Sequence, residues 1–118
     1  PTGIQRKHMA QAPQPFIRGS TFNFAMAIPT ELADGFLQDY TPEAHLRKAR
    51  NDLPTGFIAK LDCFWADPST TRILVLYHAL TEKWPVGLAE MDVLFRSSSG
   101  QVLRSKVFPF IIQRGITK

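Results

Sequence analysis

Large apolar residues alternate with small or polar ones along much of this chain, as they do in β-strands that bury one face. The alternation is strict over residues 21–28, where the large apolar side chains are Phe22, Phe24, Met26 and Ile28. Successive side chains of a strand point to opposite faces of a sheet. This segment therefore predicts a half-buried strand that ends at Pro29.

Four later segments also have strand patterns. Residues 57–65 alternate in the same way, and the side chains expected to face inward are Phe57, Ala59, Leu61, Cys63 and Trp65. Residues 72–78 are apolar on both faces, which predicts a central strand. Residues 88–96 and 102–113 flank a Ser-Ser-Ser-Gly turn, so they are expected to form a closing hairpin.

Short strands separated by turns indicate an all-β protein. We predict an immunoglobulin-like antiparallel β-sandwich of about seven strands. One short helical turn is expected at residues 81–84, where Pro85 would stop it and Trp84 would lie over the core.

Residues 41–50 carry two conflicting patterns. Thr41 could cap a helix and Pro42 suits its first turn, while the basic residues come late, as the helix dipole prefers. The same residues also alternate as a strand does, and a sandwich needs a strand at this point. Because tertiary context overrides propensity, we predict a strand here, with a helix as the alternative.

The chain divides into an N-terminal arm and one domain. Residues 1–17 show neither strand nor helix periodicity, and they predict a flexible arm. The pair His8-Met9 resembles a junction left by some expression vectors, so whether residues 1–9 are native stays open. Residues 18–118 are expected to form a single β-sandwich domain.

Composition and charge restrict the function without naming it. A chain of 118 residues that is 44% hydrophobic can bury a core without a disulfide or a metal. Its net charge of +4 owes much to Arg6, Lys7 and Arg18 near the N-terminus. The single cysteine, Cys63, is expected to be an inert core thiol. No apolar stretch approaches the roughly 18 residues of a membrane span, so we expect a soluble protein with no membrane partner.

Patterns of catalytic or metal-binding residues are missing from the sequence. The three histidines, His8, His45 and His78, have no ligand spacing to one another, and there is no nucleophile elbow or phosphate-binding loop. Catalysis needs groups that converge. We therefore predict that the protein is not an enzyme and uses no cofactor and no metal.

Several short sequence elements follow one another in a defined order over residues 18–117. They are Arg18 to Phe22, Asp39-Tyr40-Thr41, Leu46-Arg47, Thr81, Trp84, Pro85, Gly87, Asp92-Val93, Gly100 and Ile112 to Thr117. This order resembles a family of small β-sandwich proteins of tailed phages and prophages, related to the N-terminal domain of phage baseplate upper proteins. The resemblance implies a structural protein of the tail, the baseplate or another part of the virion.

The resemblance also implies a setting and partners. We expect a protein of the virion, or of the bacterial host cytoplasm during assembly, that contacts other phage structural proteins, with a homo-oligomer left open. The predicted interface is a sheet edge or a loop-rich end formed by residues 30–40 and 81–86. The candidate interface residues are Tyr40, Arg47 and Trp84.

Two other classes of function compete with this interpretation. One is a receptor- or carbohydrate-binding module that presents Trp84 to a glycan. The other is a nucleic-acid-binding accessory that uses Arg47, Lys48 and Arg50, which is unlikely because this basic group is small.

Overall fold

The protein is an antiparallel β-sandwich, which confirms the predicted fold class. The computed structural model describes residues 12–49 and 56–116. In chain order the elements are β1 (Gln14–Ile17), β2 (Phe22–Ala27), the 3-10 helix η1 (Phe36–Asp39), β3 (Tyr40–Lys48), β4 (Phe57–Trp65), β5 (Ile73–His78), β6 (Gly87–Ser97), β7 (Val102–Arg104) and β8 (Phe108–Gln113). No helix in this part of the chain is long and apolar enough to cross a membrane.

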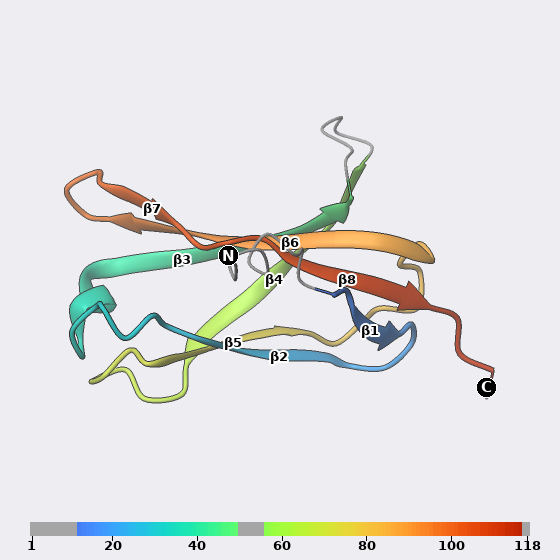
Figure 1. Cartoon of the computed structure of the whole chain (residues 1–118), viewed down its shortest axis with the longest axis horizontal. Helices are drawn as coiled ribbons and strands as arrows, with labels where there is room; N and C mark the ends of the chain where they lie inside the picture. Colours follow the sequence, from blue (N-terminus) through green and yellow to red (C-terminus); the bar gives the residue numbers. More distant parts are fainter. Residues whose placement is uncertain (1–11, 50–55, 117–118) are drawn as a thin grey trace, which may run out of the picture.

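The strands form two layers that share one strand. The hydrogen-bonded order is β1-β8-β6-β3-β4-β5-β2, with β7 paired to β6. The large layer holds β3, β6, β7, β8 and β1, and the small layer holds β5 and β2 (Figure 1). All pairs are antiparallel except the parallel pair of β1 and β8.

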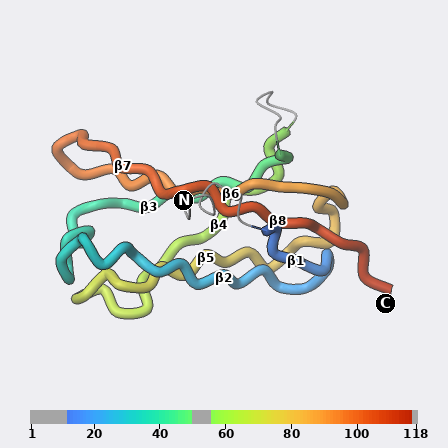
Figure 2. The backbone as a smooth tube through the Cα atoms, in the orientation of Figure 1, coloured from blue at the N-terminus to red at the C-terminus, as the bar shows by residue number. Residues whose placement is uncertain are grey.

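Strand β4 connects the layers because its two halves pair with different neighbours. Its first half lies beside β3, with Leu61 opposite Ala44, and its second half lies beside β5, with Trp65 opposite Leu74. The strand therefore runs obliquely from one layer to the other (Figure 2). This crossing places the buried faces of the two layers against each other.

The ambiguous segment is a strand, as predicted. Residues Tyr40 to Lys48 pair in unbroken register with residues Ser97 to Ala89 of β6. Ala44 and Leu46 are fully buried between β4 and β6. The neighbouring strands on both sides supply hydrogen bonds and core contacts that an isolated helical turn would lack. Tertiary context therefore determines the conformation of this segment.

The boundary of the N-terminal arm needs correction. Residues 14–17 were expected to belong to a flexible arm, yet they form β1 and pair with Phe110 to Gln113 of β8. The Phe16 ring lies 5.2 Å from the Phe22 ring, measured between centroids. One half-buried aromatic in a four-residue strand that contains Pro15 is too short a pattern to recognise. The part of the predicted arm at residues 1–11 lies outside the described residues.

Three local predictions also change. Residues 81–84 form a single hydrogen-bonded turn, in which the Trp84 N–H donates to the Thr81 carbonyl at 3.1 Å; the helical turn lies at η1 instead. Phe57 is 46% exposed rather than inward, because the register between β3 and β4 shifts at Leu46/Arg47. The expected last strand is divided into β7 and β8 by the segment around Ser105.

Candidate functional site

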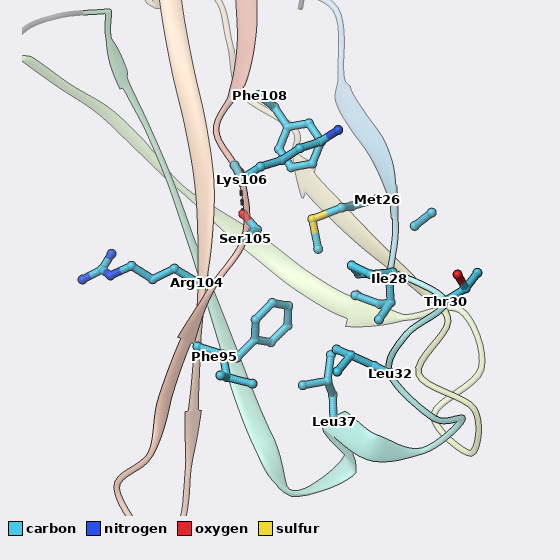
Figure 3. A pocket seen from close by; sticks show the side chains of 13 residues that line it. Met26, Ile28, Thr30, Leu32, Leu37, Phe95, Arg104, Ser105, Lys106 and Phe108 are labelled. Carbon is cyan, nitrogen blue, oxygen red and sulfur yellow. Dashed lines mark hydrogen bonds between the residues drawn. The ribbon is translucent and has the colours of Figure 1, made fainter. Parts of the chain in front are cut away.

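A pocket of about 460 Å³ opens between the two layers at one end of the sandwich. Its walls come from the end of β2 and the loop after it, from η1, and from β6, β7 and β8. The residues that line it are Met26, Ala27, Ile28, Pro29, Thr30, Leu32, Leu37, Phe95, Leu103, Arg104, Ser105, Lys106 and Phe108. Several of these side chains point toward one common space (Figure 3).

The pocket exists because the large layer is incomplete on this side. Strand β1 pairs with β8 only from Phe110 onward, so the beginning of β8 has no strand beside it on that edge among the described residues. The segment between β7 and β8 also carries a bulge, in which residues 105–107 lie opposite the two residues Asp92 and Val93 of β6 and interrupt the strand. Opposite this gap lies β2, the last strand in the order of the sandwich. The core is therefore open between β2 and the β7–β8 segment.

The inner wall of the pocket is apolar. Leu37 and Phe95 form its floor, and Ile28 and Phe108 flank it; all four are buried. Leu32 is half-buried and lies against the same core. A concave surface of this composition favours an apolar group over water, because each buried methylene contributes about 0.8 kcal/mol.

Cationic side chains stand at the rim. Lys106 is exposed, and its Nζ lies 5.3 Å from the centroid of the Phe108 ring at the mouth of the pocket. Arg104 points away from the pocket (Figure 3), and its Nη1 lies 3.9 Å from Oδ2 of Asp92. Lys106 is therefore the charged group best placed to meet a ligand.

The Ser105 hydroxyl is committed to the fold. Its Oγ accepts the Val93 N–H at 2.9 Å and donates to the Lys106 carbonyl at 2.7 Å. The bond from Val93, together with the Ser105 N–H that donates to the Val93 carbonyl at 2.9 Å, holds the segment between β7 and β8 against β6, and the bond to Lys106 fixes the local turn of the segment. The hydroxyl thus shapes the pocket rim and does not offer a free nucleophile.

The opposite wall is fixed by Arg72. Its Nη2 donates to the Pro29 carbonyl at 3.2 Å and to the Leu32 carbonyl at 2.7 Å, and its Nε lies 3.3 Å from Oδ1 of Asp34. One guanidinium therefore ties the loop after β2 to the beginning of β5. These contacts fix this wall of the pocket before any ligand binds.

The predicted interface residues do not meet at this pocket or with one another. Tyr40 begins β3 and Arg47 lies near its end, so they are about 23 Å apart at 3.3 Å per residue. Tyr40 stacks on Phe36 at 6.0 Å between ring centroids, and its hydroxyl is 3.0 Å from Oε1 of Gln101. Arg47 is half-buried on the outer face of the large layer.

Trp84 lies in the core at the end of the sandwich away from the pocket. It is 5% exposed and contacts the rings of Phe16, Phe22 and His78 at 5.4, 5.6 and 5.5 Å between centroids. The side chain therefore offers no contact surface. The segments 30–40 and 81–86, which were expected to share a loop-rich end, lie at opposite ends because β6 runs its whole length between them.

Cys63 is half-buried rather than fully buried. Burial raises the pKa of its thiol to about 11, while a hydrogen bond with the Ala44 backbone acts in the opposite direction. The thiolate is thus disfavoured at neutral pH. Within residues 12–49 and 56–116, no group of three or more His, Cys, Asp or Glu side chains could hold a metal ion.

The pocket residues were not predicted as a site. Leu103 and Lys106 fell inside what the sequence indicated as one continuous strand, so the break at Ser105 was missed. The signal available was the polar run Arg104-Ser105-Lys106 inside an apolar segment, which is unusual for a strand that must stay buried.

Comparisons with known proteins identify no family for this chain. No family model and no curated protein matches it. Among solved structures, it is similar to CopC from Methylosinus trichosporium OB3b, with 9% sequence identity and a TM-score of 0.46 over 92% of this chain and 90% of that chain. A similarity of this strength transfers no function from CopC.

The comparisons correct the predicted function. The chain was expected to be a phage or prophage structural protein, but no family model and no curated protein supports that role, and CopC, a solved structure with a similar chain course, is not a phage protein. The elements behind the expectation have general explanations in a sandwich: Trp84 fills the core, and Gly87 begins β6 at φ 134°, which favours glycine. The structural role in a virion is withdrawn; the family resemblance itself stays a prediction.

Proposed function

We propose that this chain is a non-enzymatic binding module whose pocket takes an apolar group that carries a negative charge at its outer end. The observation that supports this most directly is the pocket of about 460 Å³ between β2 and the β7–β8 segment, with apolar walls and Lys106 at its mouth. Pockets of roughly 300–1,000 Å³ are typical of small-ligand sites.

The composition of the pocket supports binding rather than catalysis. Among the described residues that line it there is no His, Cys, Asp or Glu. A general base or an activated nucleophile needs such a group within hydrogen-bonding reach of the substrate. The remaining hydroxyls, from Thr30 and Ser105, have no such partner in the lining.

The charge at the rim supports an anionic ligand end. Within the described residues, no carboxylate lies within ion-pair distance of Lys106. Its Nζ lies over the Phe108 ring while the residue as a whole is exposed, so the ammonium group can reach both the pocket mouth and water. A linear carboxylate could bury its chain and keep its head group beside Lys106.

A series of linear carboxylates tests this function. We expect calorimetric titration to show binding of decanoate that strengthens about fourfold for each added methylene, because each contributes about 0.8 kcal/mol until the pocket is full. Decanol should bind more weakly than decanoate, because it lacks the charge. Affinity that does not depend on chain length would contradict the proposal.

Two pairs of variants locate the binding. Leu103→Asp places a charge in the pocket wall and should abolish decanoate binding, whereas Val102→Asp places it on the opposite face of β7 and should not. Lys106→Glu should weaken decanoate roughly tenfold and leave decanol unchanged. Lys83→Glu makes the same charge change on the exposed turn away from the pocket, so it serves as the control.

A further inference from the structure

The outer face of the small layer is apolar. In β2, β5 and the second half of β4, the residues that point away from the core stand in cross-strand rows. Ala25, Val75 and Phe64 form the central row. Ala27 and Ile73 lie in the row beside it, and Phe64 is 51% exposed. The third row, at the margin of this face, is polar: it holds Asn23, Tyr77 and Asp62, and Asp62 is the one charged residue of the three rows.

The outer face of the large layer, by contrast, is charged. There Glu43, His45 and Arg47 alternate along β3, and Glu90 and Asp92 stand beside them on β6. Glu43 lies 3.5 Å from Nε2 of His45 and 3.6 Å from Nζ of Lys60. The same fold thus presents one charged face and one largely apolar face to its surroundings.

We propose that the apolar face of the small layer binds a second copy of this chain in a twofold symmetric dimer. The two apolar rows of this face match neither the charged face of the large layer nor the cationic rim of the pocket, because charges packed against apolar side chains would lose their water without gaining partners. Among the sheet faces of this chain, the one whose chemistry suits the apolar face is therefore the same face on another copy. A twofold interface requires such self-complementarity.

The shape of the central row supports a twofold arrangement. Its residues decrease in size from Phe64 through Val75 to Ala25. A twofold axis near Val75 would place Phe64 of each copy over Ala25 of the other. The bulky ring would then fill the space above the small side chain, as well-packed interfaces require.

The size of the face indicates a weak dimer. Three strands about 4.8 Å apart, each contributing about five residues at 3.4 Å, give a projected area of a few hundred Å². A standard stable interface buries about 800 Å² per partner. We therefore expect dissociation in the micromolar range, so that monomer and dimer exchange within an accessible range of concentration.

Sedimentation equilibrium of the full chain tests the proposal. The wild-type protein should change from monomer to dimer as its concentration rises through the micromolar range. Phe64→Glu and Ala25→Lys should each raise the dissociation constant at least tenfold. Leu88→Glu is the matched control, because Leu88 is also exposed but lies on the outer face of the large layer, and it should leave the constant unchanged.

A double variant separates a specific contact from general repulsion. Ala25→Lys combined with Phe64→Glu pairs opposite charges across the proposed twofold axis, so it should recover most of the affinity that each single change removes. Thermal unfolding checks that every variant folds, and Phe64→Gln replaces Phe64→Glu where the latter does not. A wild-type protein that stays monomeric, or a dimer that Phe64 and Ala25 variants leave intact, would overturn the proposal.

Discussion

The two ends of this sandwich are built from the same layers but are filled differently. At one end β1 extends the large layer, Phe16 packs edge to face on Phe22, and Trp84 lies tilted against both rings. At the other end β1 does not reach the beginning of β8, a bulge separates β7 from β8, and a pocket of about 460 Å³ opens beside them. We call these the closed end and the open end.

The difference shows that a few residues of backbone are enough to decide whether the core is closed. The four residues of β1 cover β8 from Phe110 to Gln113 and stop there. Phe24 links the two ends, because its ring lies 5.3 Å from both Phe110 on the closed side and Phe108 on the open side. Stability should therefore reside at the closed end, while the open end is available for a ligand.

The largest effect is expected from Trp84→Ala at the closed end. Removing this buried ring leaves a cavity among Phe16, Phe22 and His78, and truncations of this kind cost about 3–5 kcal/mol. Urea unfolding followed by circular dichroism measures the loss. Phe36→Ala removes a ring that is largely exposed and should cost far less; equal losses for the two variants would show that Trp84 does not seal the core.

A smaller loss is expected from Thr81→Val, also at the closed end. The buried Thr81 Oγ1 donates to the Ser20 carbonyl at 2.6 Å and accepts the Gly19 N–H at 2.9 Å. Valine keeps the shape but leaves both backbone groups without this partner, which costs about 1–3 kcal/mol. The same unfolding measurement applies, with Thr41→Val at an exposed position as the control. A loss of unfolding free energy no larger than that of the control would show that the Thr81 hydrogen bonds do not stabilise the closed end.

The sequence predicted the strands of both ends much better than it predicted how the ends differ. Alternation of side chains has period 2, and it revealed β2, β4 and β6 because each buries one face over at least six residues, while β5 was recognised as a run that is apolar on both faces. Strand β1 escaped because it is only four residues long and contains Pro15. Because the prediction lacked β1, it could not explain why one end is closed.

The pocket could not be predicted for a related reason. A wall made of Ile28, Leu37 and Phe95 looks in sequence like any other part of a core. Whether such residues meet a neighbour or a void depends on where distant strands end. The pattern of side chains indicates burial, whereas a pocket depends on where a neighbouring strand ends. The polar run Arg104-Ser105-Lys106 indicates the break in the last strand and not the pocket beside it.

At the open end, Leu32→Ala should have a modest effect. Leu32 is half-buried and already borders the pocket, so its truncation creates little new enclosed volume. We expect a loss of about 1 kcal/mol, well below that of a fully buried leucine. Chemical unfolding of this variant beside Trp84→Ala checks the comparison directly. A loss as large as that of Trp84→Ala would mean that the open end is packed as tightly as the closed one.

The smallest effect on stability is expected from Leu32→Phe, which adds volume instead of removing it. A full core resists an added ring at a cost of about 1–3 kcal/mol, and Phe16→Trp at the closed end should show this cost. At the open end the larger side chain can enter the pocket, so the free energy of unfolding should change by less than about 0.5 kcal/mol. The same variant should weaken decanoate binding, because the ring occupies the space of the ligand chain. Unfolding and calorimetric titration of one sample give both quantities, and a strongly destabilised Leu32→Phe protein would show that the open end has no room for a ligand.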